Sequence, residues 1–430
     1  MNVEAFRKDG EEGDLQGIMD ALGREARAAA QALAVTPATA RDTALRQAAA
    51  ALRRRVGEVL EANAKDVDAA RARGMSEALL DRLRLTEARI EGMAAGLEAI
   101  AELPDPLGRS LAEWTRPNGL AIERVSVPIG VAAVIYESRP NVTADAAGLC
   151  IKSGNAAILR GGSESFHSAS AILDCLREGL VAANLPEASV QRVPTVNRDA
   201  VGLLLAMDRY VDVVVPRGGK GLIERVRAES RVPVLAHLDG INHTYVRADS
   251  DPEMARAVLL NAKMRRPGVC GATETLLIDR DALATHLPAI VEALIDAGCE
   301  LRGDETVRAN DSRIAAATEA DWDTEYLAPI LAIRAVESLD AAIAHVNRHN
   351  SGHTEAILTA DAAAAKRFTD EVDAAILMVN ASTQFADGGE FGMGAEIGIA
   401  TGKLPPRGPV GAAELTSYKY IVRGEGQCRP

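Results

Sequence analysis

The chain has 430 residues, of which 47% are hydrophobic and 3% aromatic, and its formal net charge is −13. The negative charge and the shortage of aromatic rings exclude a nucleic-acid binder, which needs a basic face or a platform for bases. The length exceeds what one hydrophobic core supports, so we expect two or more domains.

Five scattered cysteines match neither a disulfide framework nor a metal-ligand spacing, so we expect reduced thiols and an intracellular protein. Residues 1–12 lack the apolar core of a signal peptide, and no stretch is long and apolar enough for a membrane span. The expectation is a cytoplasmic protein without a membrane or nucleic-acid partner.

The first hundred residues predict amphipathic helices. Their apolar residues recur at heptad and i+4 spacing, at Leu45, Leu52, Val56, Val59 and Leu60. Pro104 and Pro106 end this helical region. Residues 114–127 predict a hairpin, because the turn residues 116–119 divide an extended segment.

Short apolar strands then alternate with helical stretches, which indicates parallel sheets covered on both faces. The first series of predicted strands is 131–136, 156–159, 190–193 and 211–215. The second series is 244–246, 275–278, 330–333, 356–359 and 375–379, and one more strand is predicted at 415–422.

Two strand-to-helix loops of the first series, 159–164 and 215–221, combine glycines with a cation. Ligands of open parallel sheets bind beyond the carboxyl ends of strands, and a helix N-terminus attracts anions. Neither loop has the dinucleotide-binding G-x-G-x-x-G spacing, so an ordinary glycine turn explains each loop about as well. The residues concerned are Arg160, Gly161, Gly162, Arg217, Gly218 and Gly219.

Cys270 is the candidate nucleophile. It stands between Gly268 and Gly271, which permit a tight turn, and neighbouring cations lower the pKa of a thiol. The alternative is a buried cysteine that acts as a small hydrophobic residue, a description that fits Cys150 and Cys175 better. The seven histidines do not cluster and show no helical pair with a carboxylate that would indicate zinc, so no metal is expected.

Several motifs resemble the gamma-glutamyl phosphate reductase family of the aldehyde dehydrogenase superfamily over nearly the whole chain. They are Lys-Met-Arg-Arg-Pro-Gly-Val-Cys-Gly-Ala-Thr-Glu-Thr-Leu-Leu-Ile at 263–278, Tyr-Glu-Ser-Arg-Pro-Asn-Val-Thr-Ala-Asp at 136–145, Asn-Ala-Ser-Thr at 380–383, and the segments 387–399 and 414–420. The resemblance implies an aldehyde dehydrogenase-like α/β fold with three parts. These are a Rossmann-like NADPH-binding domain (1–107 and 123–233), a catalytic α/β domain (234–380) and a small β bridging or oligomerisation element (108–122 and 400–430).

The resemblance implies NADPH-dependent reduction of L-glutamyl 5-phosphate to L-glutamate 5-semialdehyde, the second step of proline biosynthesis from glutamate. The Cys270 thiolate would attack the acyl phosphate, phosphate would leave, and NADPH would deliver hydride to the thioacyl enzyme. The side-chain amide of Asn141 and the backbone N–H of Cys270 would stabilise the oxyanion. Arg160 would bind the 2′-phosphate of NADP and Glu325 the nicotinamide ribose, with Gly218 and Gly219 beside the cofactor.

Four cations are candidates for binding the substrate, although their roles are not divided and at least one is expected in a structural ion pair: Arg139, Lys263, Arg265 and Arg266. Two departures from relatives stand out. His237 occupies the approximate place of the glutamate that activates water in hydrolytic relatives, which favours reduction over hydrolysis. Asn242 stands where relatives often have a second cysteine, which removes a possible redox neighbour and leaves Cys270 itself in place.

Other functions stay open at this point. They are a hydrolytic or CoA-acylating semialdehyde dehydrogenase, a cysteine amidase or thioesterase with His237 or His243 as base, and a non-catalytic scaffold. The resemblance further implies a homo-oligomer, and it leaves open a complex with the glutamate 5-kinase that would supply the acyl phosphate.

Overall fold

The computed structural model describes residues 15–429, which form two compact units. The first unit contains the described residues up to Ala236, Met393–Gly398 and the chain from Val410 onward; the second contains His237–Gly392 and Ile399–Pro409. Residues 1–14 and 430 lie outside the described part, as does the segment on which the signal-peptide expectation rests. Within 15–429, no helix is both long and apolar enough to cross a membrane.

A four-stranded parallel sheet in the order β5-β4-β3-β6 forms the centre of the first unit. All six residues of β3 are buried, as expected of an apolar strand covered on both faces. The strands are β3 (Val131–Tyr136), β4 (Ala156–Gly161), β5 (Val190–Arg192) and β6 (Val213–Arg217).

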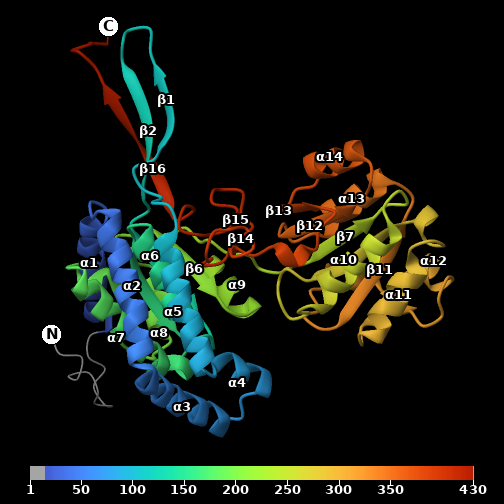
Figure 1. The fold of residues 1–430 in the computed structure, drawn as a ribbon, viewed down its shortest axis with the longest axis horizontal. Coiled ribbons are helices and arrows are strands. Elements are labelled where there is room, and N and C mark those ends of the chain that lie inside the picture. The colour runs from blue at the N-terminus through green and yellow to red at the C-terminus, as the bar shows by residue number, and fades with distance from the viewer. Residues whose placement is uncertain (1–14, 430) are drawn as a thin grey trace. The chain divides into compact units, whose positions relative to one another are not determined.

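Two layers of helices accompany this sheet (Figure 1). Residues of α1 and α8 share one apolar core with β3 and β4, whereas α2, α5, α6 and α7 pack against one another. A Cβ at Gly179 of α7 would lie 2.3 Å from the Ala44 carbonyl of α2, so these two helices touch through their backbones. The helices are α1 (Leu15–Leu33), α2 (Ala38–Arg54), α3 (Val56–Ala72), α4 (Glu77–Leu83), α5 (Glu87–Glu102), α6 (Val142–Lys152), α7 (Phe166–Ala182), α8 (Asp199–Leu205) and α9 (Lys220–Glu229).

The predicted hairpin forms a three-stranded antiparallel sheet with the C-terminal strand, in the order β1-β2-β16. Its strands are β1 (Ser110–Thr115), β2 (Ala121–Pro128) and β16 (Thr416–Arg423), and Figure 1 shows them extending away from the helices of the first unit. Trp114 and Tyr420 pack edge to face, with ring centroids 6.1 Å apart. This sheet is therefore held by strand pairing and by exposed aromatic contacts rather than by a buried core.

The second unit is built on a seven-stranded parallel sheet in the order β10-β9-β11-β8-β7-β12-β13. The strands are β7 (Asn242–Val246), β8 (Thr273–Asp279), β9 (Glu300–Gly303), β10 (Ala315–Ala316), β11 (Ile330–Val336), β12 (Thr354–Leu358) and β13 (Ile376–Val379). A separate antiparallel pair is formed by β14 (Ile399–Ala400) and β15 (Gly408–Pro409).

Helices cover both faces of the seven-stranded sheet. One apolar core joins α10 and α11 to β8 and β11, and a second joins α13 and α14 to the other face. Ser338 caps α13 by accepting a hydrogen bond from Ala341 N, which satisfies one of the unpaired N–H groups of the first turn. The helices are α10 (Pro252–Met264), α11 (Leu287–Asp296), α12 (Glu305–Arg308), α13 (Leu339–His349) and α14 (Ala362–Glu371).

Candidate active site

The loop that carries Cys270 connects α10 to β8 in the second unit. Asp251 caps α10 by accepting from Met254 N at 2.7 Å, and Pro252 stands in the first turn, where no N–H is needed. A Cβ at Gly240 would lie 2.2 Å from the Cys270 carbonyl oxygen, so only glycine allows the two backbones to approach this closely. The thiol itself is half-buried.

Asn242, at the start of β7, fixes this loop. Its Nδ2 donates to the carbonyls of Cys270 and Ala272 at 2.6 and 2.9 Å, and its Oδ1 accepts from Thr354 N at 3.2 Å. Asn242 is fully buried. Sequence reasoning noted at this position only the loss of a second cysteine, whereas in the structure one amide connects the Cys270 loop with β7 and β12.

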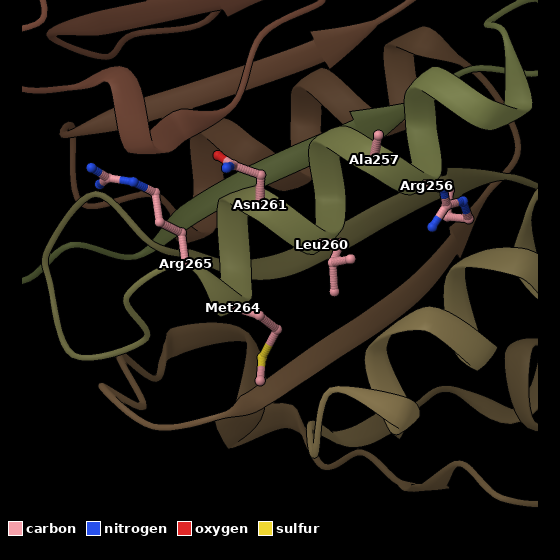
Figure 2. A pocket seen from close by; sticks show the side chains of 6 residues that line it. All are labelled: Arg256, Ala257, Leu260, Asn261, Met264 and Arg265. Atoms are coloured by element: carbon pink, nitrogen blue, oxygen red, sulfur yellow. The ribbon is translucent and has the colours of Figure 1, made fainter.

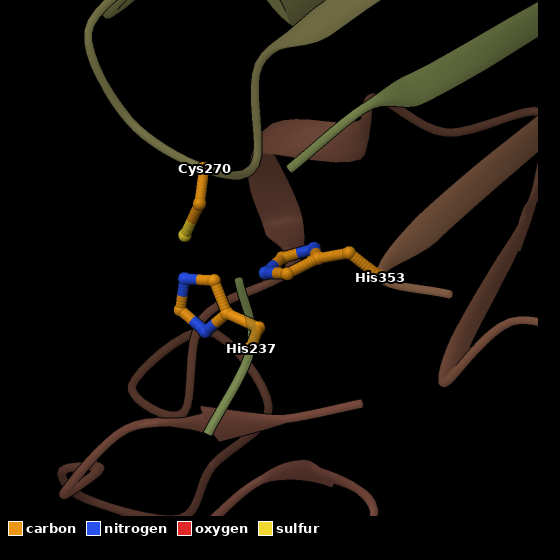
Figure 3. A group of neighbouring side chains, drawn as sticks. All are labelled: His237, Cys270 and His353. Atoms are coloured by element: carbon orange, nitrogen blue, oxygen red, sulfur yellow. The ribbon is translucent and has the colours of Figure 1, made fainter. Parts of the chain in front are cut away.

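Two histidines lie beside the thiol, as Figure 3 shows. The Cys270 sulfur and one ring nitrogen each of His237 and His353 lie within 4.8 Å of one another. His237 comes from the segment before β7, and His353 directly precedes β12. The expectation that the histidines do not cluster is wrong, because chain segments far apart in sequence bring these two together.

The tautomer of His237 follows from its hydrogen bond. Its Nδ1 lies 2.9 Å from the Ile399 carbonyl oxygen, which can only accept, so Nδ1 carries the proton. In the neutral ring, Nε2 then keeps its lone pair and can receive a proton. His243 is excluded as a base for Cys270, because it is fully buried with its Nδ1 3.0 Å from Glu355.

The cations before Cys270 have different surroundings. Lys263 is fully buried and forms an ion pair with Glu274. Its expected role in substrate binding is therefore not supported, because the side chain is inaccessible to a ligand and already has a partner. Burial raises the pKa of Glu274 to about 7, against the opposing effect of Lys263. Arg265 and Arg266 are exposed, and Gln384 Nε2 donates to the carbonyl of Arg266 at 3.2 Å.

An open depression along α10 lies near one of these arginines, as Figure 2 shows. Its lining has no histidine, cysteine or carboxylate, so it contains no group for nucleophilic or acid–base chemistry. The lining residues are Arg256, Ala257, Leu260, Asn261, Met264 and Arg265.

In the first unit, Asn141 directly precedes α6, after β3. Its Nδ2 donates to Asp145 Oδ2 at 2.9 Å, and the residue is exposed. Burial raises the pKa of Asp145 to about 6, and the hydrogen bond from Asn141 opposes this rise. Asn141 and Cys270 belong to different units, so their joint oxyanion site stays a prediction. Arg139, on the same loop, is half-buried.

Arg160 and the two predicted glycine loops lie at the carboxyl edge of the parallel sheet, where the sequence predicted them. β4 ends at Gly161 and β6 at Arg217, on either side of β3, whose carboxyl end leads to Asn141. Arg160 is buried; its Nη2 donates to the Val196 carbonyl at 3.1 Å, and its Nε has no hydrogen bond to a described residue. Burial lowers the pKa of Arg160.

Carboxylates of the first unit accept hydrogen bonds from N–H groups of the loop after β6 and of the loop after β3. Glu137 Oε2 accepts from Gly219 N at 3.0 Å, just before α9, and Glu164 Oε1 accepts from Ser138 N at 2.7 Å. A Cβ at Gly218 would lie 2.4 Å from Glu137 Oε2, and one at Gly162 would lie 2.1 Å from Glu164 Oε1. The loop at 215–221 therefore presents an N–H donor to an anionic group, whereas the loop at 159–164 supplies an acceptor, and the assignment of both loops to a cofactor stays a prediction.

Glu325 lies in the second unit and accepts from Gly240 N at 2.9 Å. Because Gly240 packs directly against Cys270, this hydrogen bond connects Glu325 to the Cys270 loop. Sequence reasoning connected Glu325 only with the cofactor ribose.

The fold, with a half-buried cysteine on a tight loop, agrees with one class of protein. The model of the aldehyde dehydrogenase family matches residues 16–307 and 315–395, so the chain belongs to that family. An acetylating aldehyde dehydrogenase from Geobacillus thermoglucosidasius, 16% identical with a TM-score of 0.69 over 97% of this chain and 98% of its own, shares the fold. The predicted fold class is confirmed.

More similar relatives have a narrower name. The gamma-glutamyl phosphate reductase of Rhodospirillum rubrum is 63% identical over 97% of this chain and 98% of its own, and that of Paramagnetospirillum magneticum is 60% identical over 97% and 99%. The crystal structure of gamma-glutamyl phosphate reductase from Thermotoga maritima has a TM-score of 0.94 at 44% identity, covering 96% of this chain and all of its own. The predicted resemblance is confirmed.

Proposed function

We propose that the chain reduces L-glutamyl 5-phosphate to L-glutamate 5-semialdehyde with release of phosphate. The observation that carries this proposal is the similarity to gamma-glutamyl phosphate reductases over nearly the full length of both chains. The half-buried Cys270 thiol on its fixed loop supplies the nucleophile that the reaction needs.

His237 takes the thiol proton on its Nε2, and the resulting thiolate attacks the acyl carbon of the substrate. The bond from that carbon to the phosphate oxygen breaks, phosphate leaves with its electron pair, and a thioester remains on Cys270. The amide of Asn141 and the backbone N–H of Cys270 stabilise the charge on the carbonyl oxygen. Arg139, Arg265 and Arg266 are proposed to bind the carboxylate and phosphate of the substrate.

The fate of the thioester depends on water. A hydrolytic enzyme needs a carboxylate or another base that activates water beside the thioester. Among the described residues, His237 and His353 each place a ring nitrogen within 4.8 Å of the Cys270 sulfur. His237 stands at the approximate place of the glutamate that activates water in hydrolytic relatives, and once it has taken the thiol proton it cannot act as a base, which supports reduction rather than hydrolysis.

A bound nicotinamide cofactor supplies the hydride for reduction of the thioester. The carboxyl edge of the first sheet fits such a group, because the buried Nε of Arg160 lacks a partner among the described residues and the loop N–H groups bind carboxylates. We assign Arg160 to the 2′-phosphate, Gly161, Gly162, Arg217, Gly218 and Gly219 to the phosphate side, and Glu325 to the nicotinamide ribose. NADPH is thus the proposed form.

The preference for NADPH is tested with Arg160→Ala. If Arg160 binds the 2′-phosphate, the variant loses most of its kcat/KM with NADPH but keeps the value measured with NADH. If kcat/KM falls equally with NADPH and NADH, Arg160 has a structural role instead.

The proposed reaction is tested in reverse, with glutamate 5-semialdehyde and NADP, with and without phosphate. We expect turnover that requires phosphate and disappears in Cys270→Ala, while that variant still binds NADPH in a fluorescence titration. Turnover that ignores phosphate would refute the acyl-phosphate chemistry and favour a hydrolytic enzyme.

The pair of Cys270 and His237 also provides what a cysteine amidase or thioesterase requires. Family membership favours the reductase, and the assay separates the two because an amidase turns over without a nucleotide. We further propose a cytoplasmic enzyme that forms a homo-oligomer. It receives its labile substrate from a glutamate 5-kinase.

A further inference from the structure

The group of Cys270, His237 and His353 has a composition that the proposed reaction does not explain. The reaction uses the thiol and the ring of His237, whereas His353 has no part in it. One sulfur and two imidazole nitrogens within 4.8 Å of one another are the donors that zinc and similar divalent cations prefer (Figure 3).

His353 points to a ligand at this place. The residue is fully buried, its Nδ1 lies 2.8 Å from the Thr354 hydroxyl, and its Nε2 makes no hydrogen bond to any described residue. Buried ring nitrogens normally have a partner, so this one requires an explanation. The rings of His353 and His237 meet edge to face, with centroids 5.0 Å apart.

His237 has the arrangement that metal-binding histidines commonly show. Its Nδ1–H donates to the Ile399 carbonyl at 2.9 Å, which fixes the ring and leaves the lone pair on Nε2. In Figure 3 the Cys270 side chain points toward this ring.

The backbones that carry the ligands are also held in place. Asn242 connects the carbonyl of Cys270 with the N–H of Thr354, the residue next to His353. Ile376 N donates to the His353 carbonyl at 3.0 Å, which fixes the entrance of β12. Such support lowers the conformational cost of bringing three ligands to one ion.

We infer that Cys270, His237 and His353 form a binding site for a thiophilic divalent cation such as Zn²⁺, and that binding reversibly blocks the nucleophile. In tetrahedral zinc sites the ligand atoms lie about 3.5 Å apart, as bond lengths of about 2.0–2.3 Å require, so the group would contract by about 1 Å. The Cys270 S–H bond breaks, a sulfur–zinc bond forms, and the proton passes to solvent. No electron is transferred, and the fourth position is left to water.

Binding of the cation does not depend on the proposed function, whereas its inhibitory effect does. A zinc-bound thiolate has its lone pair engaged and cannot attack the acyl carbon. Zinc inhibition should therefore be competitive with the acyl substrate and reversed by a chelator.

Binding is tested with Co²⁺ as a spectroscopic probe on the full-length chain, after treatment with EDTA and a phosphine reductant. We expect one Co²⁺ per chain, a thiolate-to-cobalt charge-transfer band in the near ultraviolet and the visible bands of tetrahedral cobalt. Zn²⁺ should displace the cobalt and abolish these bands.

Three variants decide the assignment. Cys270→Ser should lose the charge-transfer band, and Cys428→Ser, which removes an exposed thiol elsewhere, should keep it. His353→Asn should keep its turnover but need Zn²⁺ concentrations higher by at least about 10–100-fold, the loss that removing even a supporting group causes. A band that persists in Cys270→Ser, an absent band in the unsubstituted chain, or unchanged zinc sensitivity in His353→Asn would each overturn the proposal.

The two proposals fail in different ways. A chain that binds Co²⁺ with these spectra but does not turn over glutamate 5-semialdehyde retains the metal site and loses the proposed function. A chain with phosphate-dependent turnover and no cobalt spectrum loses only the metal site. Because Cys270→Ser changes a half-buried residue by one atom, it keeps the test decisive even if the buried His353→Asn fails to fold.

Discussion

Asn242 makes three hydrogen bonds around Cys270, the proposed nucleophile, so Asn242→Ala should lower both activity and stability. Buried carbonyls and an N–H that lose their partner cost about 1–3 kcal/mol, and misplacement of a reacting group by about 1 Å costs about a hundredfold in rate. Steady-state kinetics and urea unfolding measure the two effects. Asn347→Ala is the matched control, because Asn347 also bonds backbone groups but is exposed. Wild-type kinetics in Asn242→Ala would show that the Cys270 loop keeps its conformation without the hydrogen bonds of Asn242.

Asp145 should make stability depend on pH. Burial raises the pKa of Asp145 to about 6, above its ordinary value, so the folded chain binds more protons than the unfolded chain between about pH 4 and pH 6. The free energy of unfolding contributed by this group therefore falls as pH rises through that range.

Asp145→Asn should remove this fall, because asparagine does not titrate and still accepts a hydrogen bond from Asn141. Relative to the wild type, the variant should gain about 2 kcal/mol in the free energy of unfolding between pH 4 and pH 6. Urea titrations at several pH values measure the difference. A constant difference across the range would contradict the raised pKa.

Sequence reasoning selected Cys270 as a candidate because the evidence is local: two glycines, neighbouring cations and a following strand lie in one continuous segment. It missed His353 and the role of Asn242, because these residues meet Cys270 only when β7, β8 and β12 are neighbours in the sheet. An isolated histidine before a strand gives no such signal. Lys263 was grouped with its neighbouring cations for the same reason, since its partner Glu274 is identified only by the fold.

The strands show a similar difference between local and non-local information. β3 was predicted at its observed bounds, because it is a continuous apolar run after a glycine. β9 and β10 were missed, because Glu300–Gly303 is short and half polar and Ala315–Ala316 has only two residues. These two strands depend on pairing with a sheet that already exists, whereas buried central strands have a pattern of their own.

The β1-β2-β16 sheet is the surface that we expect to join the subunits of a homo-oligomer. Tyr418, Tyr420 and Val422 alternate along β16 and are at least half exposed, and Trp114 packs beside Tyr420. A contiguous apolar surface of this kind marks a protein contact. Replacing Tyr420 and Val422 together by serine should shift the chain to a smaller species in sedimentation velocity.

The control for this substitution is Val35→Ser, because Val35 is 83% exposed and lies after α1, outside the sheet. It should leave the sedimentation coefficient unchanged. If the double variant sediments like the wild type, another surface joins the subunits.

Neither compact unit is a continuous stretch of chain. The chain leaves the first unit after Ala236, returns for Met393–Gly398, and returns again at Val410. The family resemblance implied a boundary between residues 233 and 234, and the first crossing follows Ala236. The sequence could not place the two returns, because short glycine-rich segments have no periodicity that assigns them to a sheet.

The last return should be essential for the first unit. Leu415 is fully buried, and its carbonyl accepts from the buried Asn155 at 2.8 Å, while β16 pairs with β2 along eight residues. Deleting residues 412–430 should therefore lower the melting temperature by several degrees, since loss of a buried leucine alone costs about 2–5 kcal/mol. Deleting only residues 424–430, which follow β16, should change it little. Differential scanning calorimetry compares the two, and Leu415→Ala separates the buried side chain from the strand. Equal melting of both truncated chains would mean that the first unit folds without its C-terminal return.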